Sequence, residues 1–179
     1  MDIRFKLGNK GYMDNNMRNE IESWGIPNID ELKGRNIKFV FNSSEINKEK
    51  DRFIELHCEK WSVKFCLYDL TNDIEIFTME FKEMPQYMIS LTKELPNLKL
   101  ELLNVIDSSL RRKGIASYYI EKLKEYAINN NYSYIRVTPS PDTDIFKAQS
   151  KNNSLDLKEL INFYESKSTP EMPIKVLKI

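Results

Sequence analysis

The chain has 179 residues, which fits one domain over 1–179 with a substantial core. Lysine plus arginine and aspartate plus glutamate number 27 each, so no overall field attracts the protein to nucleic acid or to an anionic membrane. The hydrophobic fraction of 41% excludes a disordered chain, and no apolar run reaches the length of a membrane span or signal peptide. We therefore expect a cytoplasmic globular protein that binds neither nucleic acid nor membranes.

The first part of the chain alternates short elements with turns. We expect a strand at Asp2–Leu7, a helix at Met13–Trp24, one helical turn or a loop at Asn28–Gly34, and a strand at Asn36–Asn42. The helix is indicated by Met17, Ile21 and Trp24, whose spacing places them on one face. The second strand is indicated by the alternation of its apolar residues.

The next stretch is rich in β-forming residues. Polar residues at Ser43–Asp51 predict a hairpin loop. Two long strands follow at Arg52–Asp69 and Ile74–Phe81, joined by a turn at Leu70–Asp73. An antiparallel meander of about three strands is the simplest arrangement, and Pro85–Lys93 is expected to form a short helix or connection.

A strand, a helix and a second strand then follow at the spacing of a βαβ unit. The strand Leu98–Ile106 has apolar residues on both faces, which favours a position inside a sheet. The helix begins near Gly114 and ends near Asn129, and Tyr132–Thr138 is predicted to be a strand parallel to the first.

The remaining residues are predicted to form a loop, a helix and a last strand. Pro139–Asn153 is expected to be a ligand-facing loop, with or without one helical turn. Ser154–Ser166 is expected to be a helix with Ser154 as its N-cap, and Pro173–Ile179 a strand. The fold class is therefore mixed α/β: a mostly antiparallel sheet with a βαβ core and flanking helices.

The turn between the central strand and helix carries the clearest chemical pattern. It reads Arg111-Arg112-Lys113-Gly114-Ile115-Ala116, three cations and a glycine at the start of a helix. Free amides at a helix N-terminus, the helix dipole and nearby guanidinium groups together favour a multiply charged anion such as pyrophosphate. A solvated basic loop with a turn glycine is the competing interpretation, because neither G-x-G-x-x-G nor a P-loop is present.

This segment resembles the acetyl-coenzyme A signature of the GNAT superfamily, the GCN5-related N-acetyltransferases. That signature is [RQ]-x-x-G-x-[GA] between a strand and a helix, and Arg111, Gly114 and Ala116 fill its defined positions. The resemblance implies that the amides from about Arg112 to Ser117, which include Lys113 and Ile115, cradle the pyrophosphate of acetyl-CoA. It also implies that the backbone of Val105 and Ile106 runs beside the pantetheine arm, in a cleft where two parallel strands splay apart.

A second resemblance lies at Asn162–Lys167, which is similar to the F-Y-E-K segment of the same family. It implies that Tyr164 protonates the departing coenzyme A thiolate; a tyrosine packed on the apolar side of a helix is the alternative. Two positions depart from the family pattern. Leu157 stands where many members have asparagine, and Ser168-Thr169-Pro170 stands where a glycine commonly follows.

Other candidate groups carry weaker signals. By its position in the family's fold, Glu101 is a candidate general base, or else a charged residue at the sheet surface. The pair Tyr118–Tyr119 is a candidate wall of the acceptor site, or else part of the core. Cys58 and Cys66 are expected to be buried free thiols and His57 a packed or surface histidine, so we expect no metal.

Two functions from different classes follow. The first is an enzyme that transfers acetyl from acetyl-CoA to a primary amine of a small molecule or peptide by direct attack. The second is a non-catalytic acyl-CoA sensor or interaction module on the same fold, favoured by the departures at Leu157 and after Lys167. A monomer and a homodimer are both compatible with the sequence.

Overall fold

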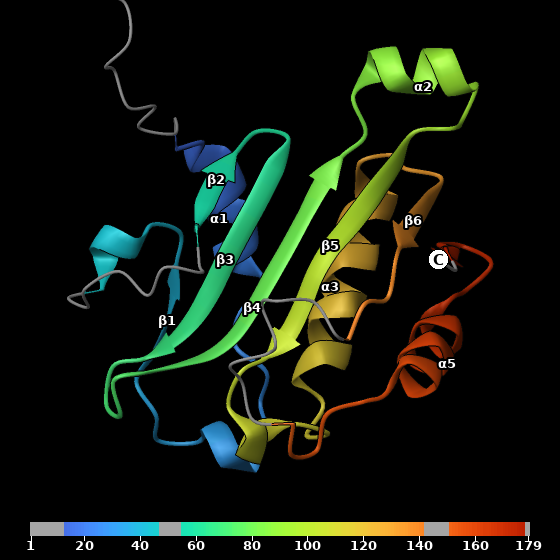
Figure 1. Ribbon diagram of the computed structural model, residues 1–179. Coiled ribbons are helices and arrows are strands. Elements are labelled where there is room, and N and C mark those ends of the chain that lie inside the picture. The colour runs from blue at the N-terminus through green and yellow to red at the C-terminus, as the bar shows by residue number, and fades with distance from the viewer. Residues whose placement is uncertain (1–12, 47–54, 142–150, 178–179) are drawn as a thin grey trace, which may run out of the picture.

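The computed structural model describes residues 13–46, 55–141 and 151–177. A seven-stranded sheet forms its centre, and the strands lie in the order β1-β3-β4-β5-β6-β7 with β2 paired to β3 (Figure 1). The strands are β1 (Ile37–Val40), β2 (His57–Glu59), β3 (Ser62–Asp69), β4 (Ile74–Glu83), β5 (Asn97–Val105), β6 (Tyr134–Val137) and β7 (Ile174–Val176). The expected mixed α/β class is confirmed, with antiparallel pairing from β1 to β5 and parallel pairing from β5 to β7.

The helices lie against and beyond this sheet. They are α1 (Asn15–Ser23), α2 (Gln86–Thr92), α3 (Ile115–Asn129) and α5 (Leu157–Lys167), with 3-10 turns η1 (Asp30–Leu32), η2 (Ser43–Glu45) and η3 (Ser108–Leu110). Helices α1 and α3 lie behind the sheet in Figure 1, α5 packs beside β7, and α2 projects beyond the ends of β4 and β5. None of the helices in the described ranges is long and apolar enough to cross a membrane.

An aromatic cluster holds α1 and α3 against the sheet. Phe65 on β3 is fully buried and contacts several rings. These rings belong to Trp24, Phe39, Phe41, Phe77 and Tyr119, with centroid separations of 5.5 to 6.3 Å. The apolar residues whose periodic spacing predicted these elements are therefore the residues that form the core.

Tyr118 and Tyr119 tie helix α3 to the end of α1. The Tyr118 hydroxyl donates to the carbonyl oxygen of Trp24, and that of Tyr119 donates to Gly25 at 2.9 Å. Tyr119 is fully buried, and its ring stacks on Phe77 at 4.8 Å. This placement gives Tyr119 the packing role rather than the acceptor-site role.

Most predicted elements are confirmed, with three corrections. The segment that begins at Ser43 was predicted to be a hairpin loop, but β1 pairs with β3 rather than with the next strand β2, and Ser43–Glu45 forms a 3-10 turn. The expected strand Arg52–Asp69 is interrupted, because β2 and β3 form a hairpin that turns at Lys60 and Trp61. The predicted N-cap Ser154 is wrong: Asp156 caps α5, since its carboxylate accepts from the Glu159 amide while the Glu159 side chain accepts from the Asp156 amide. This reciprocal capping box satisfies two amides at once.

Other expectations fall partly or wholly outside the described residues. The strand at residues 2–7 lies wholly outside them, as do the end of the 43–51 loop and most of the 139–153 loop. Cys58 and Cys66 are confirmed as buried free thiols, and burial raises the pKa of the Cys58 thiol to about 12. His57 is half-buried and pairs with the Ser62 hydroxyl at 2.8 Å.

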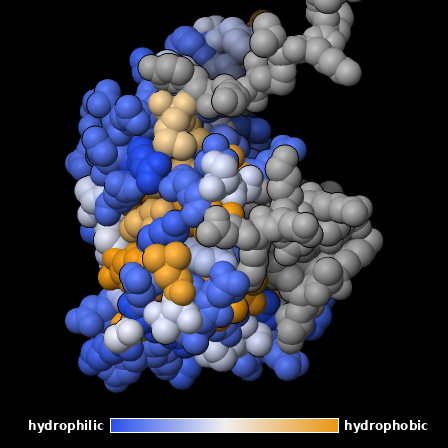
Figure 2. Space-filling view, turned by 90° about the vertical axis from the view of Figure 1, so that its left-hand side faces the viewer, coloured by the Kyte–Doolittle hydropathy of each residue, from blue (hydrophilic) through white to orange (hydrophobic). Residues whose placement is uncertain are grey.

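The surface on the β1 side of the molecule is mainly hydrophilic (Figure 2). Apolar side chains show in several areas between the hydrophilic ones in that view. A small second cluster of Val40, Cys66 and Tyr68 lies apart from the main core, with Ile46 and Leu56 packed against it.

Candidate functional site

The site begins where strands β5 and β6 part. They pair in parallel from Asn97 with Tyr134 to Leu100 with Val137, while β5 continues to Val105. Glu101 is the extra residue of a register shift against β4, where Glu80 pairs with Leu102 and Phe81 pairs with Leu100. A bulge bends its strand. The register shift therefore accompanies the separation that leaves the end of β5 beside an opening.

The turn after β5 presents backbone amides to this opening. Gly114 has a φ of 92° and precedes α3 without any side-chain cap. The Tyr118 amide donates a hydrogen bond to the Gly114 carbonyl oxygen at 2.9 Å, and this is the first backbone hydrogen bond of the helix. In the described part of the chain, the amides of Ile115, Ala116 and Ser117 meet no acceptor. Three amides at the positive end of a helix dipole form a site for an anion.

The three cations of the turn already have partners within the protein. Arg111 donates to the carbonyl oxygens of Val105 at 2.9 Å and Asn152 at 2.8 Å, and so joins the end of β5 to the segment before α5. Arg112 pairs with Glu159 at 3.1 Å, and Lys113 pairs with Glu31 at 2.8 Å. Burial lowers the pKa of the Arg111 guanidinium despite the nearby Asp107 carboxylate, but arginine remains a cation at neutral pH.

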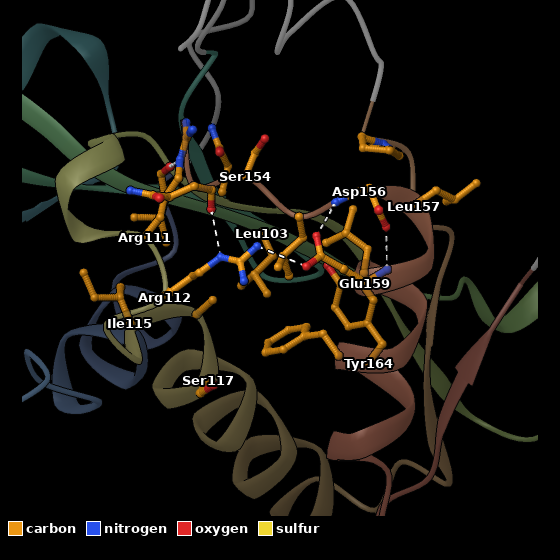
Figure 3. Close-up of a pocket in the computed structure, with 18 of the residues that line it drawn as sticks. Leu103, Arg111, Arg112, Ile115, Ser117, Ser154, Asp156, Leu157, Glu159 and Tyr164 are labelled. Atoms are coloured by element: carbon orange, nitrogen blue, oxygen red, sulfur yellow. Dashed lines mark hydrogen bonds and ion pairs between the residues drawn. The ribbon is translucent and has the colours of Figure 1, made fainter. Parts of the chain in front are cut away.

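A cavity of about 650 Å³ lies between the turn, the end of β5 and helix α5 (Figure 3). Its lining residues come from four places in the chain. They are Leu103–Val105 of β5, residues 111–117 of the turn and α3 except Lys113, Pro141, and a C-terminal wall drawn from residues between Lys151 and Tyr164. The cavity has the size of a small-molecule site, and its lining surface is mainly apolar, with polar groups at the turn and on the C-terminal wall.

The structure brings most of the predicted coenzyme residues to this cavity. Those that line it are Val105, Arg111, Arg112, Gly114, Ile115, Ala116 and Ser117. Ile106 and Lys113 were also predicted but are not among the lining residues; the Ile106 amide bonds to Ile76 on the β4 side. The sequence pattern thus located one wall of the cavity.

Tyr164 enters the cavity from α5 on the opposite wall. Its side chain is almost fully buried, and its ring points into the cavity in Figure 3. Among the described residues no hydrogen-bond partner meets its hydroxyl. Burial raises the pKa of the Tyr164 phenol well above its ordinary value, so the group keeps its proton.

Glu101 lies outside this arrangement. It is not among the lining residues, and its carboxylate pairs with Lys82 and with Lys99. Partial burial opposes ionisation of this carboxyl, but the hydrogen bonds and charges of the two lysines outweigh it and lower its pKa. The structure therefore separates the two residues that were predicted to be catalytic.

Sequence reasoning missed the acidic part of the α5 wall. Asp156 and Glu159 line the cavity opposite the basic turn, and Leu157 at its rim is half exposed. The capping-box spacing Asp156-x-x-Glu159 was a signal that could have found the true start of α5. No comparable signal links Glu159 to Arg112, because they are 47 positions apart.

No arrangement for a metal is present in the described ranges. No group of three or more His, Cys, Asp or Glu side chains within them is placed to hold an ion. Backbone amides and cationic side chains are instead the polar groups at the turn end of the cavity, and these suit an anionic ligand.

Comparisons with known proteins do not identify a family for this chain. No family model matches the chain, and no curated protein matches it. Among solved structures, the chain is similar to a ribosomal-protein-alanine N-acetyltransferase from Brucella melitensis biovar Abortus 2308, at 14% identity and a TM-score of 0.37. That likeness covers 68% of this chain and 92% of the other. A TM-score this low decides neither the family nor the activity of this chain.

Proposed function

We propose that this protein is a GNAT-type N-acetyltransferase that moves an acetyl group from acetyl-CoA to a primary amine. The observation that carries the proposal is that one cavity joins the Ile115–Ser117 amides, which meet no acceptor among the described residues, to the buried Tyr164 hydroxyl, with the end of β5 between them. The amides suit a pyrophosphate, and the apolar middle of the cavity suits a pantetheine arm. In this proposal the phenol is the proton donor to the departing thiolate.

In the proposed reaction the residues hold the donor and supply one proton. The neutral amine forms a C–N bond with the thioester carbonyl carbon, and the C–S bond breaks. The sulfur leaves as a thiolate and takes the proton of the Tyr164 hydroxyl, which water later replaces. The nitrogen releases its own proton, so the products are an amide and coenzyme A.

The base that receives the amine proton is a separate question. Glu101 stays a prediction for this role, but its geometry argues against it. A carboxylate that Lys82 and Lys99 stabilise as an anion holds a proton weakly, and Glu101 does not line the cavity. Water can accept the proton when the amine already reaches the site as the free base.

A charge at Ser117 tests the coenzyme site. Ser117 lies in the first turn of α3 and lines the cavity. A Ser117→Asp substitution suits the helix, because an acidic residue in the first turn is favourable, but it repels a bound phosphate. We expect acetyl-CoA binding, measured by calorimetry, to weaken by about tenfold or more.

Ser117→Asn is the matched control, since it has almost the same size and no charge. It should bind acetyl-CoA within about threefold of the original protein, a difference below 1 kcal/mol. Equal affinity of the Asp and Asn variants would contradict an anion site at these amides. Absence of acetyl-CoA binding by the unaltered protein would overturn the proposed function.

A further inference from the structure

An ion pair joins the turn wall and the α5 wall of the cavity. Arg112 Nη2 lies 3.1 Å from Glu159 Oε1, and Arg112 Nε donates to the Asn153 carbonyl oxygen at 3.4 Å. Figure 3 shows the Arg112 guanidinium and the Glu159 carboxylate facing each other between the turn and α5. A carboxylate of the protein itself is thus already paired with one of the cations that line the proposed anion site.

The Glu159 carboxylate is held in this orientation by the start of α5. Its Oε2 accepts from the Asp156 amide at 2.9 Å, and the Glu159 amide donates to Asp156 Oδ1 at 2.8 Å. One oxygen therefore serves the helix cap and the other faces Arg112. This division means that the charge of Glu159 and its capping role can be separated by substitution.

We propose that Glu159 is a specificity-determining residue. Its carboxylate binds Arg112 where a ligand phosphate would otherwise bind, and it thereby sets the affinity of the cavity for phosphate-bearing ligands. The inference rests on the proposed coenzyme site. A phosphate at the α3 amides competes with Glu159 for Arg112, and after exchange Glu159 is an unpaired anion facing another anion. Both consequences weaken phosphate binding and leave a ligand without phosphate unaffected.

The exposure of the pair determines how large the effect is. Arg112 and Glu159 have side-chain exposures of 54% and 43%. Ion pairs this open to solvent are weak, so an incoming phosphate can displace the carboxylate. The effect on affinity is accordingly modest, about threefold.

Glu159→Gln tests the proposal, because glutamine keeps the capping interaction and removes the charge. We expect coenzyme A to bind about threefold more tightly to this variant, and pantetheine, which has no phosphate, to bind as before. Glu165→Gln is the matched control, since Glu165 is exposed on the same helix and does not line the cavity. It should change neither affinity, and thermal melting should show that both variants stay folded.

The Arg112→Gln background shows whether Glu159 acts through Arg112. There Glu159→Gln should tighten coenzyme A binding less than it does with Arg112 present, because the competition is gone. Unchanged coenzyme A affinity of Glu159→Gln in the original background would overturn the inference while leaving the coenzyme site intact. An equal gain for pantetheine would also overturn it. If the unaltered protein does not bind coenzyme A at all, this result would instead contradict both the proposed function and this inference.

Discussion

The sheet has a closed half and an open half, and the two are built differently. In the closed half, β3 and β4 pair from Ser62 with Lys82 to Asp69 with Ile74, and the Phe65 cluster fills the space between sheet and helices. In the open half, β5 and β6 stop pairing at Leu100 and Val137, and the cavity takes the place of further strand contact.

The difference shows how one sheet provides both a scaffold and a site. Full pairing leaves no backbone groups for a ligand, whereas the parted strands leave the end of β5 beside an opening. In the open half, polar contacts of Arg111 and Arg112, rather than apolar packing, join the turn to the segment that leads into α5 and to α5 itself. We therefore expect the closed half to determine stability and the open half to determine binding.

Truncation of one core side chain and one cavity side chain gives the largest expected contrast in stability. Phe65→Ala should lower the free energy of unfolding by about 3–5 kcal/mol, because it empties the centre of the aromatic cluster. Leu103→Ala should lower it by only about 1–2 kcal/mol, since Leu103 already faces the cavity and is half-buried. Urea unfolding measures both. Equal losses would show that the two halves contribute alike.

Removal of the Tyr164 hydroxyl should affect chemistry and leave the fold intact. Tyr164→Phe keeps the buried ring and removes a hydroxyl that has no partner among the described residues. We expect kcat with a suitable amine to fall by about 10²-fold while the Kd for acetyl-CoA stays the same. An unchanged kcat would exclude the acid role. An absence of turnover in the unaltered protein across a broad amine panel, with acetyl-CoA still bound, would favour the sensor function.

The pH dependence of kcat gives a second test of the same group. A phenol donates its proton only below its pKa, and burial raises the pKa of Tyr164 above the ordinary value. Tyr164 therefore stays protonated up to a higher pH than an ordinary tyrosine. The rate should rise as the amine loses its proton and should not fall again before about pH 10, the ordinary pKa of tyrosine. A decline that begins near neutral pH would assign the acid role to another group.

The parts of the fold that depend on local patterns were predictable from the sequence. Strand β5, the turn at Gly114 and helix α3 follow from apolar periodicity and a glycine, and their observed bounds agree with the prediction to about one residue. The same signals located the amides of the cavity wall, because a helix start fixes where free amides lie.

The parts that depend on distant contacts were not predictable. The hairpin at Lys60 and Trp61 contains no glycine or proline, so a continuous strand was the natural expectation. The pairing of Glu101 with Lys82 depends on how β4 and β5 align, and sequence spacing does not give that register. The Arg112–Glu159 pair likewise depends on the docking of α5 beside the turn.

The cap of α5 provides the smallest expected effect and a local test of the open half. Asp156→Ala removes the side chain that accepts from the Glu159 amide, so it should lower the free energy of unfolding by about 1 kcal/mol. Differential scanning calorimetry should then show a Tm lower by about 2–4 °C. Asp156→Asn keeps an oxygen acceptor at the same place and should retain most of the stability.

The two variants separate capping from charge at the cavity wall. If asparagine destabilises as much as alanine, the carboxylate charge near the α5 dipole matters more than the hydrogen bond. If only alanine destabilises, the start of α5 is stabilised by one replaceable hydrogen bond. Its contribution would then be well below that of Phe65, as expected for a cavity wall outside the aromatic cluster.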